Sequence, residues 1–296
     1  MRVFLTGATG FIGSIVTEEL KAAGHQVTGL ARSDEAAARL ASWGVDVRRG
    51  EWADADGLAE GARASDGVIH CAFGTDFANY AEMGATDLRA VTAMADAMAG
   101  TGKPLVVTSG MTASTPGRPS TEADPAQTEG MGAVRGAPED RTLAAKDRNV
   151  RGVVVRLPPC VHDRGGQGLA SMMVEAARRT GVSAYLGDGA NRWPTVHRRD
   201  AASLFRLGLE RGAPGQRLHA VGESGVRLRD IAEAIGRKLG LPVRSLEPAE
   251  GFDHFGFIAG PMLNDMPAAC AVTQQTTGWR ATHPGLIEGF LGDYLD

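Results

Sequence analysis

Residues 6–13 read Thr6-Gly7-Ala8-Thr9-Gly10-Phe11-Ile12-Gly13, and this stretch decides the fold. It follows a short apolar run, Val3–Leu5, and opens an amphipathic stretch that begins at Ile12. Gly7 permits a tight turn, Gly10 lets the backbone approach a pyrophosphate, and Gly13 allows a helix to pack closely on a strand. The helix N-terminus then offers unpaired N–H groups and a positive dipole end to phosphate. We therefore predict a dinucleotide site that includes Gly7, Thr9, Gly10, Phe11, Ile12 and Gly13.

Beyond this stretch, short apolar runs alternate with longer amphipathic ones, an alternation typical of a parallel sheet covered by helices on both faces. The expected strands are Val3–Leu5, Val27–Leu30, Val45–Arg48, Gly67–Cys71, Pro104–Thr108, Gly152–Arg156 and Leu218–Val221. The pattern predicts an α/β protein with a Rossmann doubly wound parallel sheet and a smaller C-terminal substrate-binding region. We place the dinucleotide domain at residues 1–156, its sheet completed by about 195–221, and the substrate region at 157–194 and 222–296.

The end of the second predicted strand indicates which dinucleotide binds. The sequence there is Gly29-Leu30-Ala31-Arg32-Ser33, whereas an NAD site usually carries an acidic residue that accepts from the ribose 2′-hydroxyl. A guanidinium can pair with a 2′-phosphate through two hydrogen bonds, and the Ser33 hydroxyl can assist it. Arg32 and Ser33 therefore predict NADPH/NADP+ as the cofactor.

Other predicted strand ends add cofactor contacts. Glu51 can accept from the adenine amino group and Trp52 can flank the ring, while the fourth strand continues into Cys71, Ala72 and Phe73 beneath the ribose and pyrophosphate. The fifth strand ends at Thr108 and Ser109, and Pro158 follows the sixth. His70, inside the fourth strand, is interpreted as a packed histidine rather than a catalyst.

Composition excludes several classes of partner. Of 296 residues, 43% are hydrophobic and the formal net charge is -4, which does not favour nucleic-acid binding. No run approaches the roughly 18 apolar residues of a membrane span. The chain has three scattered cysteines and no His-Glu-x-x-His motif, so we expect reduced thiols, no metal site and a cytoplasmic protein.

Four motifs are typical of one enzyme family: TGATGFIG at 6–13, LVVTSG within 104–110, RLPPCVHD at Arg156–Asp163 and WPTVHRRDAA at Trp193–Ala202. On these motifs the chain resembles the extended short-chain dehydrogenase/reductases, including their epimerase/dehydratase branch. The resemblance covers nearly the whole chain. It implies hydride transfer at C4 of the nicotinamide and a substrate site built by the C-terminal half.

The family's catalytic signature is missing, which makes the chain an atypical member. The family uses a Tyr-x-x-x-Lys pair, but the tyrosines here are Tyr80, Tyr185 and Tyr294, and none has a lysine four residues later. Counting back from Arg156, the pair falls near Arg135 and Glu139, and the family's Asn falls near Asp87. Ser109 or Thr112 is expected to replace the family's hydroxyl residue. A guanidinium is a poor acid at neutral pH, so Arg135 cannot imitate the tyrosine.

Protonation of the product therefore needs another source. His162 is the titratable candidate, since it follows the strand expected to border the nicotinamide. The alternative is a substrate that delocalises the charge and supplies its own proton.

A segment rich in Gly, Pro and acidic residues, 114–136, is expected to be a mobile loop over the site. These features, with a resemblance to angucyclinone ketoreductases, favour an NADPH-dependent reductase of a polycyclic aromatic polyketide ketone. A non-catalytic NADP(H) sensor and a sugar-nucleotide epimerase or dehydratase are the alternative interpretations.

Overall fold

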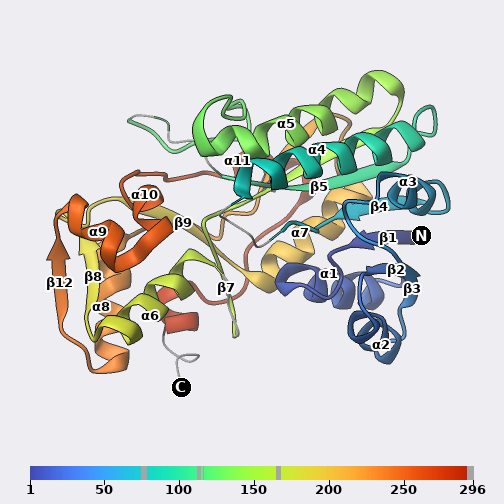
Figure 1. Ribbon diagram of the computed structural model, residues 1–296. Helices are drawn as coiled ribbons and strands as arrows, with labels where there is room; N and C mark the ends of the chain where they lie inside the picture. Colours follow the sequence, from blue (N-terminus) through green and yellow to red (C-terminus); the bar gives the residue numbers. More distant parts are fainter. Residues whose placement is uncertain (75–78, 112–114, 116, 165–167, 292–296) are drawn as a thin grey trace.

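The computed structural model describes residues 1–74, 79–111, 115, 117–164 and 168–291, and its centre is a parallel sheet (Figure 1). The seven strands lie in the order β10-β6-β5-β4-β1-β2-β3. Their bounds are β1 Arg2–Thr6, β2 Gln26–Ala31, β3 Asp46–Arg49, β4 Gly67–His70, β5 Pro104–Gly110, β6 Arg151–Leu157 and β10 Gln216–His219. This order reverses at β1, as in a doubly wound sheet, and it confirms the predicted Rossmann fold.

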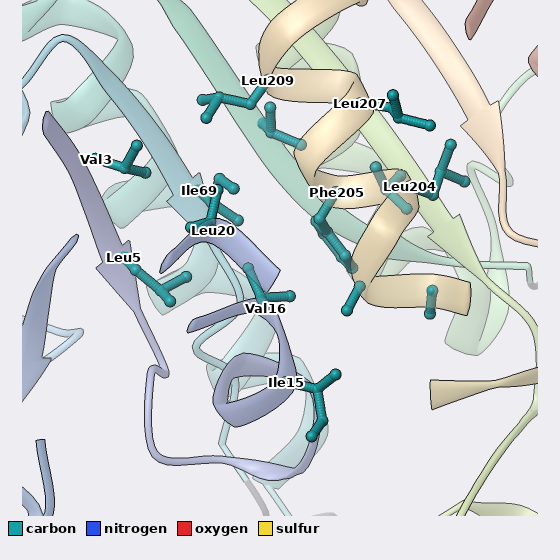
Figure 2. Packing of buried hydrophobic residues seen from close by; sticks show 14 of the residues in the cluster. Val3, Leu5, Ile15, Val16, Leu20, Ile69, Leu204, Phe205, Leu207 and Leu209 are labelled. Carbon is teal, nitrogen blue, oxygen red and sulfur yellow. The ribbon is translucent and has the colours of Figure 1, made fainter. Parts of the chain in front are cut away.

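Helices cover both faces of the sheet because side chains alternate along each strand. Val3 and Leu5 of β1 face one core, while Phe4 between them faces the other. The first core packs against α1 (Phe11–Ala22), α2 (Asp34–Ser42) and α7 (Arg198–Arg211). Figure 2 shows Val16 and Leu20 of α1 and Phe205 and Leu209 of α7 on this face of the sheet, where they belong to one core. On the opposite face lie α3 (Ala55–Arg63), α4 (Tyr80–Ala97) and α5 (Gly130–Ala144), which continues into the 3-10 turn Ala145–Arg148.

A smaller region with its own apolar core lies to one side of the large sheet (left in Figure 1). It contains a three-stranded sheet in the order β11-β9-β7 and a two-stranded sheet of β12 and β8. Its elements are β7 Cys160–His162, α6 Leu169–Thr180, β8 Ser183–Leu186, β9 Arg192–His197, β11 Glu223–Arg227, α8 Leu228–Leu239, β12 Val243–Leu246, α9 Pro248–Phe255, the 3-10 turn Gly256–Ile258, α10 Ala259–Met262 and the π-helical turn Leu286–Phe290.

After α10 the chain returns to the large sheet. Helix α11 (Ala271–Thr277) packs against α7 and β10, and the buried Trp279 belongs to the same core as Val16 and Phe205. The Trp279 indole N–H donates to the Asp200 carbonyl at 2.9 Å, which fixes the returning segment on α7. The sequence-based division at 157–194 and 222–296 stays a prediction, and residues 271–279 contribute to the core of the large sheet.

One predicted segment differs from the structure. Helix α5 begins at Gly130, inside the segment expected to be a mobile loop, so that part of the loop prediction is wrong. Glycines and Pro138 in α5 argue for a loop, but tertiary packing overrides this propensity. Gly84 of α4 lets Val134 of α5 approach so closely that a Cβ at Gly84 would lie 2.4 Å from the Val134 side chain. Among the described residues, no helix has the length and apolarity needed to cross a membrane.

Candidate cofactor site and adjoining cleft

The loop between β1 and α1 is shaped to hold phosphate groups. Gly7 has φ +68°, and a Cβ there would lie 2.7 Å from the Ala72 nitrogen at the end of the neighbouring strand. A Cβ at Gly13 would lie 2.0 Å from the Gly7 carbonyl oxygen. Helix α1 begins after Gly10, and within the described part of the chain no side chain caps its N–H groups. The loop and helix end therefore fit a pyrophosphate.

Arg198 adds a positive charge next to this loop. Its guanidinium lies over the Phe11 ring at 4.5 Å, and Nη1 donates to the Phe11 carbonyl at 3.3 Å. Asp163 holds Arg198 from the other side through an ion pair of 3.0 Å. The sequence does not place Arg198 in the cofactor site, because nothing in the local pattern indicates that α7 starts beside the glycine loop.

The adenosine end of the predicted site lies at the ends of β2 and β3. Arg32 is exposed directly after β2, and the Ser33 hydroxyl oxygen accepts from the Ala36 amide at 3.1 Å, which caps α2. Arg49, the last residue of β3, donates to the Ser33 carbonyl and pairs with Asp34 at 2.8 Å. Sequence analysis did not single out Arg49, although the Arg48-Arg49 pair at a strand end was a signal for it.

An aromatic wall continues from this end toward the cleft. The rings of Trp52 and Phe73 are 6.1 Å apart, and Phe73 meets Tyr80 edge-on at 6.0 Å. Glu51 is exposed beside Trp52, and Ala72 is half-buried. Burial raises the pKa of the Cys71 thiol to about 12, so this residue is neutral and serves as packing beneath the predicted cofactor site.

A chain of buried polar groups occupies the places expected for the family's Tyr and Asn. The Thr6 hydroxyl lies 2.7 Å from His70 Nδ1, and His70 Nε2 lies 2.9 Å from Asp87 Oδ1. Asp87 accepts from Arg135 Nη1 at 2.9 Å, and Arg135 Nη2 donates to the Thr108 carbonyl. The Arg135 guanidinium also stacks on the Phe73 ring at 4.1 Å. Because every one of these groups is bonded, Arg135 is held rigidly at the edge of the cleft.

A second cluster of buried polar side chains is centred on Glu139. Its carboxylate accepts from Arg156 at 2.5 and 3.0 Å and from Arg217 at 2.7 Å, and the Ser109 hydroxyl also bonds to it. Burial alone would raise the pKa of Glu139, but the bonds from Arg156, Arg217 and Ser109 lower it overall. Glu139 therefore stays ionised and cannot carry a proton to substrate. A small cleft beside it is lined by Ser109, Ser120, Gln127 and Arg135 among others.

His162 ends β7 and is 2% exposed. Neither ring nitrogen has a hydrogen-bond partner among the described residues, and its ring meets His197 edge-on at 5.5 Å. Burial, followed by the charge of His197, lowers the pKa of His162 to about 4. The imidazole is therefore neutral at pH 7 and has no proton to spare as a general acid.

The remaining predicted residues take these positions. Thr108 is half-buried and donates to the His70 carbonyl at 2.8 Å, and Pro158 is buried directly after β6. Thr112 lies outside the described residues. The structure thus brings Thr108, Ser109 and Arg135 together, whereas His162 belongs to the histidine cluster around His197. The catalytic roles of Ser109, Thr112 and His162 stay predictions.

Comparison with known proteins gives consistent matches. A model of the NAD dependent epimerase/dehydratase family matches residues 3–221. The chain is 41% identical to the uncharacterized protein C2A9.02 of Schizosaccharomyces pombe over 99% of both chains. It is 30% identical to 2-alkyl-3-oxoalkanoate reductase of Stenotrophomonas maltophilia over 73% of this chain and 67% of that protein. The solved structure of DesIV, a dTDP-glucose 4,6-dehydratase of Streptomyces venezuelae with NAD and TYD bound, covers 96% of this chain and 93% of its own, with TM-score 0.76 and 21% identity, which shows a shared fold.

Proposed function

Because the chain belongs to the NAD dependent epimerase/dehydratase family of extended short-chain dehydrogenase/reductases, we propose that it is an NADPH-dependent ketoreductase. Family membership makes it an NAD(P)-dependent oxidoreductase with a nicotinamide dinucleotide cofactor. The preference for NADPH is carried by one observation: an exposed arginine, Arg32, follows β2 where an NAD enzyme usually has an acidic residue.

The residues present fit such a cofactor along its length. Gly7 and Gly13 keep the loop folded tightly at the uncapped N-terminus of α1, where a pyrophosphate fits, and Arg198 adds positive charge beside it. Trp52 follows β3, at the end of the site predicted for adenine. Thr108, Ser109 and Pro158 lie where the nicotinamide end is expected. The bound cofactor supplies hydride at C4, and the protein's task is to hold a ketone carbon next to that position.

The proton that completes the reduction comes, in this proposal, from the substrate. Ser109 donates to Glu139, Glu139 is ionised and His162 is neutral, so none of the three is a good acid. Burial raises the pKa of the Tyr80 hydroxyl above its ordinary value, against the nearby charge of Arg135, which makes this tyrosine a poorer acid as well. A phenol or enol beside the ketone can delocalise the negative charge and release its own proton.

A small-molecule substrate with a ring ketone on a polycyclic aromatic polyketide, of angucyclinone type, meets this chemical requirement. The second candidate is an open-chain 2-alkyl-3-oxoalkanoate, which is favoured by the name of the Stenotrophomonas relative. A sugar-nucleotide epimerase or dehydratase usually needs a tyrosine-like base, and the sequence has no Tyr-x-x-x-Lys. This difference disfavours that alternative.

The test is incubation of the protein with NADPH and a panel of hydroxylated polycyclic ketones and 2-alkyl-3-oxoalkanoates, following loss of nicotinamide absorbance. The proposal expects turnover with an aromatic ketone that carries a neighbouring hydroxyl, and little with its O-methylated counterpart. Tight NADPH binding without turnover of any ketone would instead indicate a cofactor sensor and would overturn the proposal.

Protonation by the substrate also predicts how variants of the candidate residues behave. Ser109→Ala, Thr112→Val and His162→Gln should each lower kcat less than about tenfold, because none of these side chains supplies the proton. A loss of several orders of magnitude in any one variant with normal NADPH affinity would assign the proton to that residue and contradict substrate assistance.

A further inference from the structure

Arg49 contacts the residue that begins α2, and Arg32 lies at the end of the neighbouring strand. Strands β2 and β3 are neighbours, and their register pairs Ala31 with Arg49. Arg32 directly follows Ala31, so the two basic residues leave adjacent strands at the same edge of the sheet. Arg49 bends toward the start of α2, where Nη1 donates to the Ser33 carbonyl and Nη2 pairs with Asp34 at 2.8 Å. This places its charge beside the position predicted for the adenosine 2′-phosphate.

The pair of Arg49 with Asp34 lies in water. The Arg49 side chain is 49% exposed and that of Asp34 is fully exposed. An ion pair of this kind contributes little to stability, because solvent and salt screen it. A phosphate dianion carries more charge than a carboxylate and accepts hydrogen bonds from a guanidinium in the same bidentate geometry. A 2′-phosphate can therefore take the place of Asp34 on Arg49 at small cost.

The acidic residues of the first turn of α2 oppose an anion there. Asp34 and Glu35 stand where the helix N-terminus would otherwise attract phosphate, and Arg32 alone leaves this charge uncompensated. With Arg49 included, two positive charges match the two carboxylates, and displacement of Asp34 leaves Arg49 available to the phosphate.

We propose that Arg49 is a second ligand of the NADPH 2′-phosphate and that Asp34 competes with the phosphate for it. The inference rests on the proposed preference for NADPH. It assigns cofactor discrimination to three residues: Arg32 and Arg49 favour the phosphorylated cofactor, and Asp34 limits its affinity.

The experiment measures dissociation constants of NADPH and NADH by nicotinamide fluorescence at fixed ionic strength for wild type, Arg49→Ala and Asp34→Asn. Arg49→Ala should weaken NADPH about tenfold and change NADH less than twofold. Asp34→Asn should tighten NADPH several-fold, again with little change for NADH. Arg39→Ala is the matched control, because it removes the same charge from α2 at a residue that stacks on Trp43. It should leave both constants within twofold.

Circular dichroism and melting temperature establish that each variant is folded. If Arg49→Ala leaves NADPH affinity unchanged, or weakens both cofactors equally, the assignment of Arg49 is wrong. Weaker NADPH binding in Asp34→Asn contradicts the competition. These results differ from failure of the proposed function: a wild type that prefers NADH, or one that binds NADPH and reduces no ketone, contradicts the latter before any variant is compared.

Discussion

Asp87 is fully buried between two partners, His70 and Arg135. It lies near the position expected for the family's Asn. Asp87→Ala should lower the free energy of unfolding by about 3–5 kcal/mol, because it leaves the guanidinium of Arg135 buried without its counterion. Urea denaturation measures this. The matched control is Asp96→Ala, which removes a half-exposed carboxylate that pairs with Arg141 and Arg148. The control should cost at most about 1 kcal/mol. Equal effects of both variants would contradict a buried ion pair at Asp87.

His162 makes stability depend on pH. Its pKa is about 4 in the folded protein, against 6.5 for the unperturbed group, so the unfolded chain binds the proton more tightly between these values. Its stabilising contribution is therefore complete above pH 6.5 and is lost as pH falls toward 4, by about 3 kcal/mol in total. His162→Phe should flatten the fall in unfolding free energy over this window. Part of the slope should remain, because burial also lowers the pKa of His197 and His219. An unchanged slope would mean that His162 does not titrate in this window.

Single residues could be predicted from sequence only where their role is local. The glycines of the loop and Arg32 were identified because strand, turn and helix follow one another within a few residues. The bond between Asp87 and Arg135 joins positions 48 residues apart, and the Ser109–Glu139 bond depends on how α5 lies against β5. Neither has a sequence signal, since packing sets both.

The contact between α1 and β1 depends on Gly13. A methyl group at this position would overlap the Gly7 carbonyl, so Gly13→Ala must push α1 away from the loop. We expect NADPH and NADH affinity to fall at least tenfold alike, because the pyrophosphate is common to both. Gly260→Ala in α10 is the control, since a Cβ there meets nothing within 4 Å. Titration of both cofactors measures the effect, and normal affinity in Gly13→Ala would exclude this loop as the phosphate site.

At the level of elements, the parallel strands and most helices could be predicted because their hydrophobic pattern is regular. Each of the seven strands expected from the sequence corresponds to a strand of the large sheet. The first part of helix α5 could not be predicted, because Gly130, Gly132, Gly136 and Pro138 favour a loop when taken alone. Its stability comes from close packing on α4 at Gly84, which only the folded chain shows.

For the whole molecule, the C-terminal segment ties the smaller region to the large sheet. Trp279 is 2% exposed in the core under α7, far along the chain from the strands that it helps to cover. Trp279→Ala should cost about 3–5 kcal/mol of unfolding free energy, because it leaves a large cavity and removes the bond to Asp200. Denaturation followed by circular dichroism, with the exposed Phe252→Ala as control, tests this. A cost near that of the control would show that the segment is not part of the core.

The proposed function depends on discrimination between the two cofactors at the end of β2, and titration of both cofactors tests this discrimination most directly. Calorimetric titration of the wild-type protein with NADPH and with NADH, at equal ionic strength, should give a dissociation constant at least tenfold lower for NADPH. Arg32→Ala should remove most of this difference while leaving NADH binding unchanged. No binding of NADPH, or a clear preference for NADH, would contradict a preference for the phosphorylated cofactor.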